Sequence, residues 1–328
     1  MYSPKLLILL FCLLCNISAA TQAEIYKWTD DKGRVFFSDK APQRKNFQEI
    51  SAQISETGNF FGFEKVKAVD VYVPNRDRGL AKVNLDIELV NFELSDVDRE
   101  KINVGVRKVY QAFINWFGWP AKPTEHIKIK IFGRYNEFED YQKIIDEKHV
   151  INRSFYNLQL REIVMLGSQI NDETMRTLFH EATHAIFHMQ YGALPVWINE
   201  GLAMVFSGID PDKKGVHINL PIDIDEHIKA MLAERSLQRF GNYLAIDNIQ
   251  WRSSGENVEY IYYRVAWSMM MFMLSEQKNT EALESIIAKL NHSEWWAQGG
   301  LAAHFAANYP GGLVELDKRW RNWIRKSR

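Results

Sequence analysis

The chain has 328 residues, of which 46% are hydrophobic, and this is enough to bury a sizeable core in one large domain or two unequal ones. Its 40 lysines and arginines almost balance its 41 aspartates and glutamates. Because no excess of either charge remains, the composition gives no reason to expect a nucleic acid or an anionic membrane as a partner, and we expect no nucleic acid.

The N-terminus has the layout of a secretory signal peptide, which we place at residues 1–23. Lys5 is followed by an apolar run from Leu6 to Cys15 and then by small residues as far as Ala23. The run is shorter than the roughly 20 apolar residues of a transmembrane helix, and no later stretch reaches that length, so we expect no integral membrane span. Both cysteines lie in this segment, so disulfides and thiol nucleophiles are excluded from the mature chain. An exported protein of the bacterial periplasm or the extracellular space is predicted.

Residues 24–41 predict a β-hairpin, because two short aromatic-rich segments flank Asp30-Asp31-Lys32-Gly33. The segment resembles a short domain of unknown function that follows the signal peptide in many exported bacterial proteins. The resemblance is carried by Tyr26-Lys27-Trp28 at its start and Phe37-Ser38-Asp39-Lys40-Ala41-Pro42 at its end. It implies a location and no chemistry. We take residues 24–78 as a small β-rich domain with its linker, because the second half is polar and rich in turn formers.

Residues 79–328 predict a larger domain that mixes strands and helices. Alternating apolar residues indicate strands at 82–94 and 126–132. Apolar residues at helical spacing indicate helices at 95–116, with Ser95 as the N-cap, and at 135–145. The expected fold class is therefore α+β, with a small β-hairpin domain in front of the larger one.

The stretch His180-Glu181-Ala182-Thr183-His184 can hold a metal ion. On a helix at about 100° per residue, Phe179 and Ile186 belong to an apolar stripe, and the two histidines project from nearly the opposite side. Since residues four apart lie above one another, both imidazoles can reach one ion, and Glu181 sits beside them to take a proton from metal-bound water. Zinc is the expected ion, because it accepts three protein ligands with an open position and lowers the pKa of bound water to about 7.

A third ligand decides whether this pattern is meaningful, because His-Glu-x-x-His alone arises by chance on the order of once in a hundred such chains. Glu200 is the candidate. Pro195 can open a second helix that carries it, and the turn at Tyr191-Gly192-Ala193 can bring that helix back to the histidines.

The two motifs together resemble the gluzincin metallopeptidases, in the bacterial branch where His-Glu-x-x-His is closely followed by Pro-x-Trp-x-x-Glu-Gly-x-Ala. The second motif is Pro195-Val196-Trp197-Ile198-Asn199-Glu200-Gly201-Leu202-Ala203, and a looser resemblance extends over about residues 80–328. The resemblance implies a zincin-like peptidase domain that acts on a peptide or protein substrate. It also implies that His180, His184 and Glu200 bind zinc and that Glu181 is the base and proton shuttle.

In this family the strand before the metal helix is the sheet edge that binds an extended substrate, and Leu160–Leu166 occupies that place here. An ordinary edge strand that binds nothing is the alternative. Family members also often carry a tyrosine near the start of a later helix, which donates to the oxyanion, and Tyr263 is the candidate. Tyr260 and Tyr262 compete with it, and a purely structural role for all three stays open.

Two nearby residues are not expected to be ligands. His188 continues the four-residue series, but the metzincin pattern that uses a third histidine needs glycine at the position of Phe187. Asp172 is expected to cap the metal helix. The alternative to an enzyme is a metal-stabilised envelope module that docks partners, and the intact Glu181 argues against it, because a structural zinc needs no base.

Overall fold

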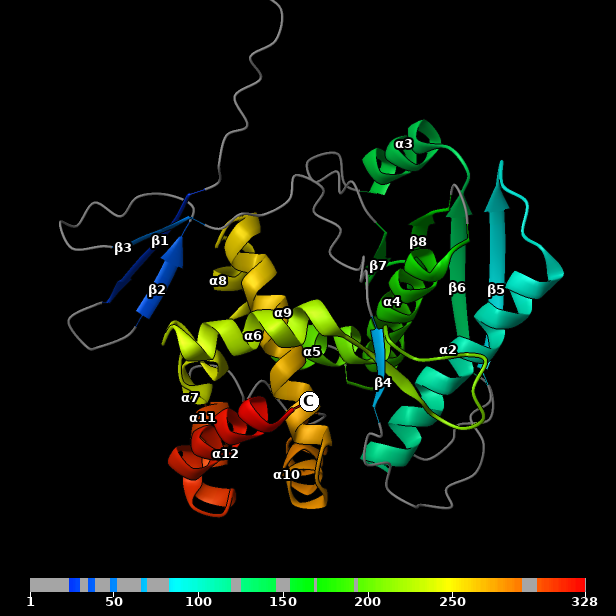
Figure 1. The fold of residues 1–328 in the computed structure, drawn as a ribbon. Coiled ribbons are helices and arrows are strands. Elements are labelled where there is room, and N and C mark those ends of the chain that lie inside the picture. The colour runs from blue at the N-terminus through cyan, green and yellow to red at the C-terminus, as the bar shows by residue number, and fades with distance from the viewer. Residues whose placement is uncertain are drawn as a thin grey trace, which may run out of the picture. The chain divides into compact units, whose positions relative to one another are not determined.

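The computed structural model describes residues 24–29, 35–38, 48–51, 66–69, 83–118, 125–145, 154–167, 170–191, 194–290 and 300–327. The chain divides into two compact units, Met1–Gly58 and Asn59–Arg328 (Figure 1). The predicted signal peptide and the predicted boundary at residue 78 lie outside the described residues. Mixed helices and strands with a small N-terminal unit make the chain an α+β protein, as predicted.

The first unit contains a three-stranded antiparallel sheet. Strand β1 (Glu24–Thr29) pairs with β2 (Val35–Ser38) on one side and with β3 (Gln48–Ser51) on the other. In the pair of β1 and β2, Tyr26 lies opposite Ser38. The predicted hairpin is confirmed, and a third strand joins it.

The second unit is built on a four-stranded sheet in the order β5-β6-β8-β7. Strands β5 (Val83–Val90), β6 (Glu125–Phe132) and β8 (Glu162–Leu166) are parallel, and β7 (Phe155–Asn157) runs antiparallel to β8. The first two lie where alternation predicted strands. A smaller sheet pairs β4 (Val66–Val69) with β9 (Ile218–Pro221).

The prediction that residues 160–166 form the sheet edge is wrong. Strand β8 lies inside the sheet, between β6 and β7, and β7 is the edge strand. The reason is a tight turn before β8, in which the side-chain oxygen of Asn157 accepts hydrogen bonds from the backbone N–H groups of Gln159 and Leu160, both at 2.9 Å. This turn folds the three residues of β7 back onto β8.

Helices lie on both faces of the sheet. Helix α2 (Asp96–Phe117), capped by Ser95 as predicted, and helix α4 (Asp172–Tyr191) pack on each other and on the sheet (Figure 1). Helix α3 (Tyr135–Ile145) covers the opposite face through Phe138. Helix α4 therefore packs on one face of the sheet, and this packing fixes its position.

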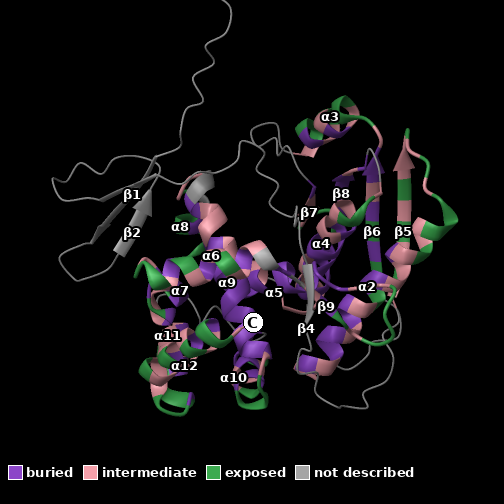
Figure 2. Cartoon of the chain, viewed as in Figure 1, coloured by how far each residue is buried: buried purple, intermediate pink, exposed green. Residues whose placement is uncertain are grey.

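The other described elements of the second unit are helices. Its helices are α5 (Val196–Phe206), α6 (Ile222–Ala233), α7 (Phe240–Leu244), α8 (Asn248–Arg252), α9 (Glu256–Leu274), α10 (Gln277–Ile287), α11 (Gly300–Asn308) and α12 (Gly312–Lys326). Figure 2 shows that α5 and much of α9 are buried. A helix that is apolar on all sides belongs in a core, so these two helices form the centre of the helical part.

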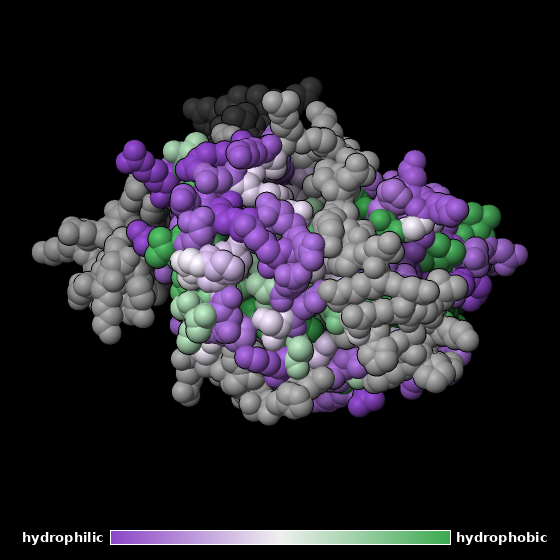
Figure 3. Space-filling view, turned by 90° about the horizontal axis from the view of Figure 1, so that it is seen from below, coloured by the Kyte–Doolittle hydropathy of each residue, from purple (hydrophilic) through white to green (hydrophobic). Residues whose placement is uncertain are grey.

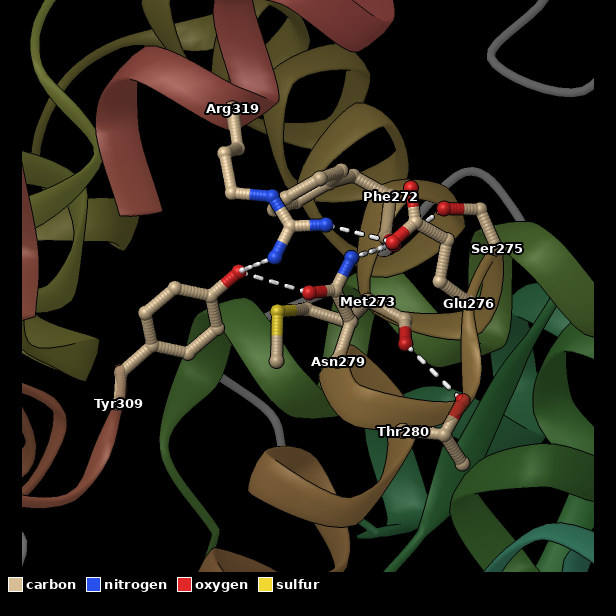
Figure 4. A network of polar contacts seen from close by, with 8 residues as sticks. All are labelled: Phe272, Met273, Ser275, Glu276, Asn279, Thr280, Tyr309 and Arg319. Carbon is tan, nitrogen blue, oxygen red and sulfur yellow. Dashed lines mark hydrogen bonds and ion pairs between the residues drawn. The ribbon is translucent and has the colours of Figure 1, made fainter. Parts of the chain in front are cut away.

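The C-terminal end of α9 is fixed by polar contacts with the helices that follow it (Figure 4). The amide of Asn279 donates to the carbonyl oxygen of Phe272 at 3.1 Å, and the hydroxyl of Tyr309 donates to the side-chain oxygen of Asn279 at 2.7 Å. Arg319 donates to the Tyr309 hydroxyl at 3.1 Å and pairs with Glu276. The Phe272 carbonyl also accepts hydrogen bonds from the backbone N–H and the hydroxyl of Ser275, so Asn279 adds to the contacts of a carbonyl in the last turn of the helix.

The face of the molecule seen in Figure 3 is mostly hydrophilic over the described residues, with hydrophobic residues scattered between them. None of the helices in the described part of the chain is both long enough and apolar enough to span a membrane.

Candidate metal centre

Helix α4 carries both histidines of the first motif, and its start is fixed by a cap. Asn171, the residue before the helix, accepts a hydrogen bond from the backbone N–H of Thr174 at 2.9 Å. The prediction that Asp172 caps the helix is wrong by one residue, because the helix already begins at Asp172. Its carboxylate lies in the first turn, where a negative charge suits the helix dipole.

The side of α4 that carries the motif is more enclosed than the sequence suggested. Phe179 and Ile186 are buried, as expected for the apolar stripe, but His180 and Glu181 are also buried, at 3% and 6% exposure. Helix α5 packs against this side. The side chains of His184 and Glu200 keep 13% and 15% of their surface, so they are the more accessible members of the centre.

The structure brings Glu200 to the two histidines. The Nε2 atoms of His180 and His184 are 3.1 Å apart, and Oε2 of Glu200 lies 3.4 Å from each of them. Donor atoms at about 2.0–2.1 Å from a tetrahedral zinc lie about 3.3 Å from one another. The triangle therefore has the size of one face of such a site. Within the described ranges it is the one group of three acidic, histidine or cysteine side chains close enough to share an ion.

Helix α5 brings the carboxylate into place. Pro195 stands directly before the helix, as its N-cap, and Glu200 follows within the helix, near its middle. The neighbouring Trp197 and Ile198 are 1% and 0% exposed, so their packing fixes the rotation of the helix about its axis. This arrangement follows the sequence prediction that a proline-led second helix carries the third ligand.

The three groups are strongly coupled. Burial would raise the pKa of the Glu200 carboxyl, but the charge of His184 and the contact with both imidazoles hold it well below its usual range. Burial would lower the pKa of His184, whereas Glu200 most strongly, together with Glu181 and the hydrogen bond to Asn199, raises it to about 9. Positive charge between these groups is thus stabilised, and a divalent cation benefits from the same field.

Asn199 was missed by the sequence analysis. Its side-chain oxygen lies 3.0 Å from Nδ1 of His184 and accepts a hydrogen bond from it. Because an amide oxygen only accepts, Nδ1 is the donor in this contact, and Nε2 is left facing the shared centre. The available signal was its place directly before Glu200, where a polar residue on the same short helix can reach a neighbouring ligand.

Among the three candidate tyrosines, Tyr263 lies beside the centre, with its ring centroid 6.4 Å from that of His180. Tyr260 is engaged elsewhere, because Arg264 donates to its hydroxyl and stacks at 4.1 Å from its ring centroid. Tyr262 is buried, which raises its pKa. The geometry therefore favours Tyr263 over its two competitors.

His188 is not part of the triangle. Its Nδ1 lies 3.1 Å from the hydroxyl of Tyr156 on β7, and burial together with the charge of Arg161 lowers its pKa. The contact joins strand β7 to α4 one helical turn beyond His184.

Two family models match the chain. Residues 9–57 match Domain of unknown function (DUF4124), and residues 174–296 match Protein of unknown function (DUF1570). The second match includes both motifs and Tyr263. The search among curated proteins and the search among solved structures found no match. The chain therefore contains a DUF4124 domain at its N-terminus and a DUF1570 domain that encloses the candidate metal centre.

Proposed function

We propose that the chain is an exported zinc-dependent metallopeptidase that hydrolyses peptide bonds. The observation that carries this proposal is the convergence of one donor atom each from His180, His184 and Glu200, at mutual distances of 3.1 to 3.4 Å. Two imidazoles and one carboxylate are a ligand set typical of catalytic zinc, which keeps a fourth position for water. The resemblance of both motifs to gluzincins supports the same function.

The residues present fit a zinc ion. The Oε2 atom of Glu200 is buried and receives no hydrogen bond from a described residue, although two imidazole nitrogens lie 3.4 Å from it. A buried carboxylate oxygen in that position is well suited to ligate a cation. When bound, zinc supplies a Lewis acid that activates water and polarises the substrate carbonyl.

The surrounding side chains take the remaining roles. Glu181 is the base: it accepts a proton from the attacking water and passes it to the leaving amine. Its charge reaches the centre, since it contributes to the raised pKa of His184. Asn199 orients His184, and Tyr263 donates a hydrogen bond to the oxyanion that forms when the carbonyl is attacked.

Strand β7 is the proposed docking edge for an extended peptide. Among the described strands it has β8 on one side and none on the other, so its free side can pair with a substrate backbone. The contact of Tyr156 with His188 holds β7 next to the metal helix. A peptide paired with this strand would therefore run past the metal ligands.

The test combines metal analysis of the purified mature chain with a digest of an unbiased peptide library. We expect about one zinc per chain and cleavage that a chelator abolishes. Glu181→Gln should keep the zinc and lose turnover by about 10²-fold or more. A variant that cleaves as fast as wild type would remove Glu181 from its role as base. A wild-type chain that holds zinc and cleaves no library member would favour the binding module instead.

A further inference from the structure

Gly201 stands in the middle of a buried helix, where glycine is disfavoured. It lies near the centre of α5, directly after the ligand Glu200. Glycine in a helix interior is unfavourable relative to alanine, because it loses more conformational freedom on folding. Its presence therefore calls for a packing reason, and the neighbouring helix α9 supplies one.

No room exists at Gly201 for even one methyl group. An added Cβ would lie 2.5 Å from Cγ of Met270 and 2.6 Å from the backbone oxygen of Ala266, both on α9. The methionine side chain can turn away, but the carbonyl oxygen moves only if α9 moves. Because ordinary contact begins near 3.4 Å, α9 would have to retreat by about 0.8 Å.

This contact connects the metal ligand to the tyrosine. Glu200 precedes Gly201 on α5, and Tyr263 lies three residues before Ala266 on α9, which places the two α9 residues on the same side of that helix. We infer that Gly201 is a positioning residue: its missing side chain lets α9 approach α5 closely enough to stand Tyr263 beside the ligands. The inference rests on the proposed function and deepens it.

Other contacts of α9 hold it in directions that Gly201 does not control. Arg264, next to Tyr263, donates to Asp223 on α6 at 3.1 Å. The C-terminal end of α9 is tied to later helices by Asn279 (Figure 4). With these tethers in place, a methyl group at Gly201 would change chiefly the separation of α9 from α5. Because Tyr263 is part of α9, a change in this separation would also change the distance between Tyr263 and His180.

The expected effect is kinetic. A misplacement of about 1 Å in a catalytic site can lower the rate by about 10²-fold. We expect Gly201→Ala to lower kcat by about 10- to 100-fold. KM and zinc affinity should stay close to wild type, because the ligands and the docking edge are untouched.

A double-mutant cycle separates positioning from general damage. If Gly201 acts through Tyr263, the Gly201→Ala change should lower kcat in the wild-type background and change it by less than about twofold in a Tyr263→Phe background. The matched control is Gly105→Ala on α2, where an added Cβ would lie 2.0 Å from the ring of Phe179. Its effect should be the same in both backgrounds.

A structure of zinc-loaded Gly201→Ala gives a readout that does not depend on turnover. We expect α9 and the Tyr263 ring to be displaced from an unchanged ligand triangle. Three results would overturn the inference: wild-type kcat in Gly201→Ala, equal losses in both backgrounds, or wild-type kcat in Tyr263→Phe. If Gly201→Ala does not fold, the same cycle is run with the double variant Gly201→Ala/Met270→Ala, in which the shorter side chain at position 270 removes one of the two close contacts of the new Cβ. Failure of the proposed function would look different, because wild type itself would then cleave nothing.

Discussion

Helix α9 takes part in two buried polar regions of opposite character. Near Tyr263 it faces the candidate metal centre, where three ionisable side chains point at one another. At its C-terminal end it meets the network around Asn279, where the Asn279 amide donates to the Phe272 carbonyl and the Tyr309 hydroxyl donates to Asn279 (Figure 4). The first arrangement leaves room for a cation among its members, and the second is complete in itself. In this protein, a cluster of buried polar side chains indicates a binding site where the groups point at one another without forming a complete set of hydrogen bonds.

The largest expected effect is a loss of zinc affinity when His184, a member of the candidate metal centre, is replaced. Replacing His184 by Ala removes one of the three proposed ligands, so zinc affinity should fall by several orders of magnitude and hydrolysis should reach background. Competition with a chromophoric chelator measures the affinity. The same variant should unfold at nearly the temperature of zinc-free wild type, because the core packing is unchanged. A His184→Ala chain that binds zinc as wild type does would exclude the proposed ligand set.

The converse variant lies in the network. Asn279 is fully buried, and truncation to Ala removes the hydrogen bonds that its amide makes with the Phe272 carbonyl and the Tyr309 hydroxyl, which keep only their contacts with Ser275 and Arg319. We expect a loss of about 2–3 kcal/mol in the free energy of unfolding, with zinc affinity unchanged. Urea unfolding of the zinc-free chain measures it, with the exposed Lys278→Ala as control. If Asn279→Ala weakened zinc binding as much as it weakened stability, the two regions would not be independent.

A smaller effect is expected at Asn199, which supports a ligand without being one. Replacement by Ala removes the acceptor that fixes the proton on Nδ1 of His184, and such changes lower metal affinity by about 10- to 100-fold. Asn199→Asp keeps an acceptor oxygen in the same place and should retain most of the affinity. Equal affinities for wild type and Asn199→Ala would leave His184 oriented by packing alone.

Local patterns in the sequence carried much of this architecture. The spans of α2 and α3 follow apolar periodicity, and the pair His180 and His184 follows from one helical turn. Glu200 became a candidate through Pro195, which can open a second helix, and the resemblance between motifs then implied its role as a ligand. The edge strand was misassigned, since the three residues of β7 are too few to show alternation. Contacts between distant segments, such as Gly201 with α9, leave no periodic trace at all.

A pH-dependent effect is expected at His227 on α6, a half-buried histidine whose surroundings differ from those of His184. Burial and the charge of Arg264 lower its pKa to about 4, against the opposing charge of Asp223, whereas carboxylates raise the pKa of His184. Since the unfolded chain binds the proton more tightly, stability should fall as the pH drops from about 6.5 to about 4. Thermal unfolding of zinc-free protein across this range measures the loss. His227→Gln cannot take up the proton, so its melting temperature should fall less than that of wild type over the same range. If the melting temperatures of the two proteins fell equally with pH, His227 would be protonated as easily in the folded chain as in the unfolded one. Arg264 would then not disfavour its charged form.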